Sequence, residues 1–149
     1  MPKLATNKRA KFDYEILDTL EAGIALSGQE VKAVKTGQAK LQGAFILIRG
    51  NEAWLKNAHI SRYKHAGPDD SYDPTGDRKL LLHKREIIKW RKKMEGERLT
   101  IVPISLYTKA GKIKLEIGLG RGKREFEKRD TIKKRELDRE ARTIKYVSR

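Results

Sequence analysis

The fold is decided by residues 112–119, which read KIKLEIGL. Apolar residues occupy every second position of this stretch, so in an extended chain they share one face. These residues are Ile113, Leu115, Ile117 and Leu119. Lys112, Lys114 and Glu116 fall on the opposite face. The stretch therefore predicts a β-strand that buries one face and holds Lys114 outward near its middle.

The same alternation occurs immediately before this strand, with one interruption. Leu99–Ile101 alternates, and the pattern resumes one position out of phase at Ile104–Leu106, with Pro103 at the change. Because proline cannot donate a ladder hydrogen bond, this change of phase predicts a bulge or a sheet edge. The short segment Lys109–Gly111 then predicts a hairpin loop between the two strands.

Segments further out supply more strands and two helices. The other strand-like runs lie at 14–17, 22–26, 45–48 and 53–55. Residues 28–35 and 83–95 predict short helices that end at Gly37 and Gly96. A long loop rich in Asp, Gly and Pro spans residues 64–79. We therefore expect a mainly β fold with flanking helices. A small closed antiparallel barrel of the oligonucleotide-binding type takes roughly 100 residues, although periodicity alone also allows a small sandwich.

Charge divides the chain into two parts. The 149 residues carry a formal net charge of +15. Residues 121–149 hold twelve Lys or Arg against six Asp or Glu and few large apolar side chains. We expect an RNA-binding β-barrel domain over 1–120 and a basic tail over 121–149 that is disordered when free. Leu137, Ala141 and Ile144 are spaced for one helix face, so the tail is expected to become helical on a partner surface.

Several function classes are excluded or disfavoured. With no cysteine, the chain has no disulfide, thiolate metal site or cysteine nucleophile. Asp69, Asp70, Asp73 and Asp77 lack the spacing of a calcium loop, so we expect no metal and no cofactor. The sequence holds no recognisable catalytic constellation or export signal and no run long enough to cross a bilayer. A cytoplasmic monomer that is not an enzyme is expected, with no membrane partner.

Basic residues interleave with aromatic and amide side chains at four places, which are residues 7–14, 56–57, 62–65 and 78–79. Cations that meet phosphates beside planar groups that stack on bases are typical of proteins that hold unpaired or looped RNA. Composition alone leaves two other classes open. They are a ribosomal structural protein with a basic extension and an RNA-modifying or RNA-cleaving enzyme.

An ordered set of short motifs resembles the SmpB family, the SsrA-binding proteins of bacterial trans-translation. The motifs are Asn7–Ala10, Leu20–Gly23, Gly28–Lys32, Arg78–Leu82, Val102–Tyr107, Gly122–Arg124 and Lys128–Arg129. The resemblance runs from about residue 7 to the C-terminus. It implies an oligonucleotide-binding-type barrel that binds the tRNA-like domain of transfer-messenger RNA and delivers it to stalled ribosomes. The nascent chains on those ribosomes are then tagged for degradation.

The resemblance also implies which residues make the contacts. Those matching the family's RNA-contact set are Tyr14, Glu21, Leu81, His83 and Lys114. His83 stands where some relatives carry Asn, and both side chains hydrogen-bond. Residues matching the tail segment that meets the decoding region and the mRNA channel of the small subunit are Gly122, Lys123, Arg124, Phe126, Lys128, Arg129 and Ile144. A mobile, strongly basic tail further suggests that it senses whether the mRNA channel is vacant.

Overall fold

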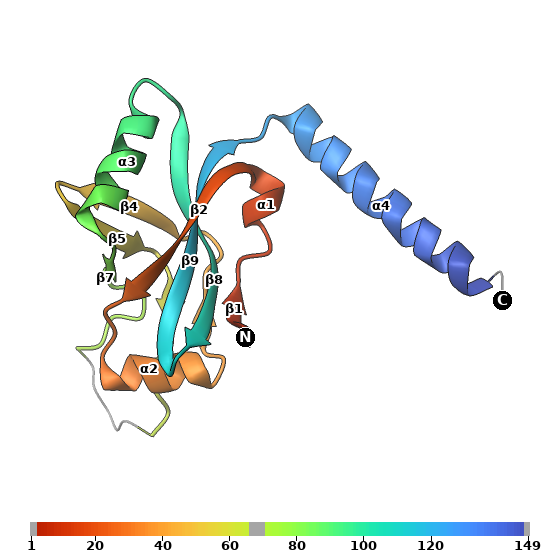
Figure 1. Ribbon diagram of the computed structural model, residues 1–149. Coiled ribbons are helices and arrows are strands. Elements are labelled where there is room, and N and C mark those ends of the chain that lie inside the picture. The colour runs from red at the N-terminus through yellow and green to blue at the C-terminus, as the bar shows by residue number, and fades with distance from the viewer. Residues whose placement is uncertain (1–2, 66–70, 148–149) are drawn as a thin grey trace.

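The computed structural model describes residues 3–65 and 71–147 and shows a sheet wrapped around one core (Figure 1). The strands of the main sheet are β1 (Lys3–Thr6), β2 (Tyr14–Ile24), β4 (Phe45–Arg49), β5 (Glu52–Lys56), β7 (Arg78–Leu81), β8 (Leu99–Lys109) and β9 (Lys112–Gly122). A small second sheet pairs β3 (Ala39–Lys40) with β6 (His59–Ile60). The helices are α1 (Ala10–Asp13), α2 (Gly28–Lys35), α3 (Lys84–Met94) and α4 (Glu125–Val147).

Hydrogen bonding joins the main sheet into a ring. The strand order is β1-β8-β4-β5-β7-β2-β9, and β9 pairs again with β8. All of these pairings are antiparallel. The predicted mainly β fold with flanking helices is therefore confirmed. The finer assignment to a closed barrel of the oligonucleotide-binding type stays a prediction.

The β8–β9 hairpin follows the predicted pattern. Ala110 and Gly111 form its two-residue turn with φ values of 52° and 78°. Positive φ at both turn residues matches the twist of the strands that they join. The register between β8 and β9 shifts between Pro103 and Ser105, as the change of phase in the sequence predicted.

Two helices begin and end close to the predicted residues. Ser27 and Glu30 form a reciprocal capping box at the start of α2, and Gly37 follows its end with a φ of 83°. Helix α3 begins one residue later than predicted and ends one residue earlier, before Gly96. Its Trp90 indole donates a hydrogen bond of 3.0 Å to Asp18 of β2, which fixes α3 against the ring.

The main core lies inside the ring, and a smaller apolar cluster lies outside it. The inward residues of β9 are all buried, and Leu115 and Ile117 are fully inaccessible. Burial of side chains of this size contributes about 1.5–3 kcal/mol each. On the outer face, Ala10 of α1 packs against Val102 and Ile104 of β8. The outer face of β9 is therefore covered at its C-terminal end and open near Lys114.

The end of β9 lies two residues beyond residue 120, and the division of the chain into an RNA-binding domain and a basic tail stays a prediction. Strand β9 continues to Gly122, which pairs with Tyr14 of β2. Beyond it, α4 projects away from the body as one helix (Figure 1). The prediction that the tail is disordered when free is not addressed by this helix and stays a prediction.

Candidate nucleic-acid interface

A row of registered residues crosses the open part of the outer face. Leu81 of β7 lies opposite Gly23 of β2, and Gly23 lies opposite Lys114 of β9. Lys114 in turn lies opposite Tyr107 of β8. Residues directly opposite one another in antiparallel strands share a face, so the sheet holds Leu81 and Lys114 about 10 Å apart, two strand spacings. We call the surface formed by Leu81, Gly23 and Lys114 the strand row.

Gly23 makes the strand row shallow at its centre. A Cβ atom at this position would lie 3.1 Å from Cβ of Leu81, which is closer than most real contacts. The absence of a side chain lets Leu81 lean over β2 while remaining 57% exposed. Gly23 itself is buried beneath Leu81, so its role in the strand row is to seat the Leu81 side chain. Gly23 belongs to the motif Leu20–Gly23, but no role was predicted for it from the sequence. A glycine inside a strand pattern is the signal that could have indicated one.

Lys114 is half-buried and has no ion pair within the residues that the structure describes. Its direct neighbours across the sheet are a glycine and a tyrosine. The Glu21 carboxylate attracts the Lys114 charge without forming a direct ion pair with it, so the ammonium group is available to a phosphate. Leu81 offers an exposed apolar surface beside it for a ribose or a base face. The strand row therefore combines the two kinds of contact that unpaired or looped RNA requires.

A hydrogen bond that crosses the outer face of the sheet holds the Glu21 side chain in position. The Tyr107 hydroxyl reaches over β9 and donates a short hydrogen bond to Glu21 Oε2. Lys109 Nζ lies 3.3 Å from the other carboxylate oxygen. The Tyr107 hydrogen bond, together with Lys109, holds the pKa of Glu21 below its usual range. Burial and the nearby Glu21 carboxylate raise the pKa of Tyr107, so the pair stays as carboxylate and neutral phenol near neutral pH.

His83 lies two residues after Leu81, at the start of α3. Its backbone N–H donates to Glu86 Oε1 at 2.9 Å, and its side chain is exposed. The first helical residues, Lys84 and Arg85, are also exposed. The structure thus brings four of the five predicted RNA-contact residues, Glu21, Leu81, His83 and Lys114, to one region around Gly23.

Tyr14 lies apart from those four residues, at the other end of β2. It packs over Gly120 at the edge of the small outer cluster. It also lines a groove of about 240 Å³ together with Asn7, Arg9 and Asp13 of the neighbouring α1 segment. Tyr14 pairs with Gly122 at the end of β9, so it lies where the tail leaves the sheet and not in the strand row. We call the segment Gly122–Arg124 the base of the tail.

The base of the tail is tied to α1. The Lys123 backbone N–H donates to the Asp13 carbonyl at 2.8 Å, and the Asp13 carboxylate accepts ion pairs from Arg9 at 3.3 Å and Lys128 at 3.5 Å. The Phe12 ring lies within about 6 Å of three cations. These are Arg9 at 4.6 Å, Arg135 at 5.9 Å and Lys128 at 6.0 Å.

The remaining predicted tail residues lie at the end of β9, between β9 and α4, and on α4. Gly122 ends β9, Arg124 lies between β9 and α4, and Arg129 is exposed on α4. Phe126 and Ile144 fall within α4, and their side chains lie outside the described part of the structure. Sequence reasoning missed Phe12 and Asp13 as the residues that hold the tail.

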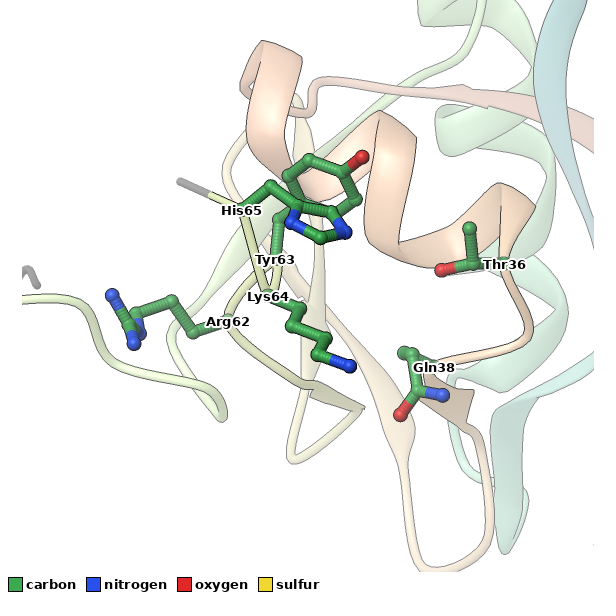
Figure 2. A pocket seen from close by; sticks show the side chains of 6 residues that line it. All are labelled: Thr36, Gln38, Arg62, Tyr63, Lys64 and His65. Carbon is green, nitrogen blue, oxygen red and sulfur yellow. The ribbon is translucent and has the colours of Figure 1, made fainter. Parts of the chain in front are cut away.

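Three of the four basic–aromatic stretches contain residues with structural roles. Arg78 is buried, Asn7 donates to the Pro103 carbonyl at 3.0 Å, and Lys56 pairs with Asp77 at 2.6 Å. The expectation that these side chains face RNA is therefore wrong for Arg78 and Asn7, because their polar groups satisfy buried backbone and carboxylate partners. The stretch 62–65 instead lines a surface pocket (Figure 2).

Residues 3–65 and 71–147 hold neither a metal-binding cluster nor a membrane-spanning helix. No group of three or more His, Cys, Asp or Glu side chains there could hold a metal ion. Asp69 and Asp70 of the loop considered above lie outside the described residues. No helix in the same part of the chain is long and apolar enough to span a membrane.

Comparison with known proteins identifies relatives over nearly the whole length. The family model described as SmpB protein matches residues 4–146. An SsrA-binding protein of Mesoplasma florum is 54% identical over 144 residues, which cover 96% of this chain and 97% of that protein. One from Thermosynechococcus vestitus is 47% identical over 137 residues, covering 92% of this chain and 90% of the relative.

A solved structure agrees with these relatives. Its description is "tmRNA-SmpB: a journey to the center of the bacterial ribosome", and its matching chain is 43% identical with a TM-score of 0.66. The match covers 80% of this chain and 84% of the other. The family match, the identity of the relatives and the shared fold agree over most of the molecule, and this chain belongs to the SmpB family.

Proposed function

We propose that this chain binds the tRNA-like domain of transfer-messenger RNA, the SsrA RNA, and delivers it to stalled ribosomes for trans-translation. The observation that carries the proposal is the high identity, over almost the full length, to proteins named SsrA-binding protein. The solved structure described as tmRNA-SmpB in the ribosome supports the same RNA and the same ribosomal partner. The chain acts as a cytoplasmic monomeric binding factor and not as an enzyme.

The strand row is the proposed contact for the tRNA-like domain. Lys114 neutralises a phosphate, Leu81 packs on the exposed face of a nucleotide, and His83 hydrogen-bonds a base or sugar. Glu21 keeps Tyr107 flat across β9 and so maintains the shape of this surface. The pairings that close the ring of strands support a barrel of the oligonucleotide-binding type beneath it.

The tail is the proposed contact for the ribosome. Residues 121–149 form the second functional part, and the 23 residues of α4 extend about 35 Å as a helix. The segment Gly122–Arg129 meets the decoding region, and the basic helix enters the mRNA channel only when no mRNA occupies it. Phe126 and Ile144 supply apolar contacts along that path. The tail is disordered before it binds and helical afterwards.

The RNA contact is tested by titration of the tRNA-like domain with purified protein at several salt concentrations. Lys114→Ala is expected to weaken binding and to reduce the salt dependence by about one phosphate contact. Its melting temperature should barely change, because the lysine makes no ion pair in the described structure. Lys92→Ala, an exposed lysine at the end of α3, is the matched control. Equal binding by both variants would remove Lys114 from the site.

The tail is tested separately by truncation after Arg124, which removes α4 and leaves β9 complete. The shortened protein is expected to bind the tRNA-like domain and to fail in tagging nascent chains on ribosomes that lack a stop codon. Normal tagging by the truncated protein would refute the role of the tail. Failure of the full-length chain to prefer the tRNA-like domain over an unrelated structured RNA would refute the proposed function itself.

A further inference from the structure

A second surface with the chemistry of an RNA contact lies at the C-terminal end of α2. A pocket of about 320 Å³ opens there, between the end of the helix and the segment that follows β6. Its lining residues are Thr36, Gln38, Arg62, Tyr63, Lys64 and His65 (Figure 2). None of these residues belongs to the strand row or to the base of the tail.

One wall of the pocket is a fixed aromatic pair. The rings of Tyr63 and His65 meet edge to face, with centroids 5.4 Å apart and planes inclined by 72°. Tyr63 is half-buried and packs against the main core, and Lys32 of α2 places its ammonium group 5.6 Å from the centre of the ring. Packing and the cation together hold this ring in position, so the pocket wall is formed before any ligand arrives.

Polar groups with unused bonding capacity face this wall. Figure 2 shows the Lys64 side chain extending toward Gln38, while Arg62 points away from the other five residues. Within the described residues, the Gln38 amide makes no hydrogen bond and Lys64 makes no ion pair. None of the described residues that line the pocket is acidic.

The end of α2 does not oppose an anionic ligand as strongly as a bare helix C-terminus would. The carbonyls of Lys32, Ala33 and Val34 accept hydrogen bonds from the backbone of Thr36, Gly37 and Gln38. The Thr36 hydroxyl donates to two of these carbonyls, at 3.1 and 2.9 Å. Because these carbonyls already accept hydrogen bonds, they oppose an anion near Lys64 less strongly than free carbonyls would.

We propose that this pocket binds a single unpaired nucleotide of RNA. The Tyr63–His65 pair contacts the base, the Gln38 amide hydrogen-bonds the base edge as both donor and acceptor, and Lys64 contacts the adjoining phosphate. A volume of about 320 Å³ is at the small end of ligand pockets, and the aromatic wall is reached only by a base outside a duplex. The inference rests on the proposed function for its RNA partner, which is either transfer-messenger RNA or ribosomal RNA.

The test compares two double variants with the wild-type chain. Gln38→Ala with Lys64→Ala removes the polar wall of the pocket. Gln29→Ala with Lys40→Ala removes the same residue types from exposed positions that do not line the pocket. All four side chains are exposed, so both double variants should retain the melting temperature of the wild type.

Each protein is titrated over a range of salt concentrations in two arms, one with the tRNA-like domain of SsrA RNA and one with 70S ribosomes. The pocket variant is expected to lose about tenfold or more in affinity in one arm, with a salt slope smaller by about one. The control variant should lose less. The arm that shows the pocket-specific loss identifies the source of the nucleotide.

Equal behaviour of the pocket and control variants in both arms would overturn the pocket inference, provided that the wild-type chain binds. The proposed function would survive that result, because Lys114 and the tail are tested independently. Conversely, a wild-type chain with no preference for the tRNA-like domain over an unrelated RNA would overturn the proposed function and the pocket inference with it.

Discussion

Arg78 and Lys79 are adjacent basic residues at the start of β7, and the structure predicts opposite consequences for their removal. The Arg78 side chain is 4% exposed and pairs through Nε with Glu30 Oε2 at 2.7 Å. Its two terminal nitrogens donate to the carbonyls of Ala58 and Pro74, each at 2.8 Å. The guanidinium therefore joins the start of α2, the turn after β5 and the segment that leads into β7.

The expected cost of Arg78→Ala follows from the groups that it leaves behind. Breaking a buried ion pair by removing one partner costs about 3–5 kcal/mol. Burial raises the pKa of Glu30, but the Ser27 N–H and Arg78 outweigh it and hold the pKa below its usual value. Because the Ser27 bond of 3.1 Å survives the substitution, we expect the lower end, about 3 kcal/mol. That corresponds to roughly 6–12 °C in Tm for a chain of this size.

Urea unfolding followed by tryptophan fluorescence measures this cost, since the chain has two tryptophans. Lys79→Ala is the matched control, because Lys79 is exposed and its pair with Glu52 at 3.5 Å is solvated. Such pairs contribute less than about 1 kcal/mol. Adding Glu30→Gln to Arg78→Ala should recover part of the loss by removing the unpaired charge. If Arg78→Ala and Lys79→Ala unfold within about 1 kcal/mol of each other, the structural role of Arg78 is refuted.

Three further outcomes are expected. Gly23→Ala should weaken binding of the tRNA-like domain, because the new methyl group would crowd Leu81 at 3.1 Å and displace it; unchanged affinity would show that the position of Leu81 does not matter for binding. Glu21→Gln should make stability, measured by urea unfolding, fall less steeply as the pH is lowered. The pKa of Glu21 is lowered in the folded protein, so its carboxylate stabilises the fold at pH values above the unfolded pKa of about 4.3, and this contribution disappears as the pH falls. In the ribosome-bound protein, where the tail is helical, Asp13→Asn should increase amide hydrogen exchange in the first turns of α4, because Lys128 loses its 3.5 Å partner; identical exchange would contradict the role of Asp13 in holding α4.

Local patterns were sufficient to predict most of the elements. The alternation in residues 112–119 identified both faces of β9, and the change of phase at Pro103 identified the bulge in β8. Glycines at 37 and 96 marked the ends of two helices. The hairpin loop at Lys109–Gly111 also predicted that β9 pairs with β8. The pairing of β9 with β2 could not be read in this way, because the period of a strand says which face is buried and not which strand lies beside it.

The candidate interface was predictable in its members but not in its arrangement. The resemblance named Leu81 and Lys114, but their separation across Gly23 depends on strand register. Charge patterning also failed to separate Arg78 from Lys79, because burial decides which of two adjacent cations is free. Likewise, the contacts of Phe12 and Asp13 with α4 join positions more than 100 residues apart, a distance over which no local pattern operates.

The attachment of α4 has a mechanical consequence once the tail is helical on its partner. Beyond Gly122 the body restrains the helix mainly through Phe12 and Asp13 near its first turns. A rigid rod about 35 Å long converts each degree of tilt at its pivot into about 0.6 Å of travel at its tip. A tilt of ten degrees at α1 would thus move the far end by about one turn of helix. The position of the C-terminal end of α4 is therefore determined by α1, a four-residue helix near the opposite end of the chain.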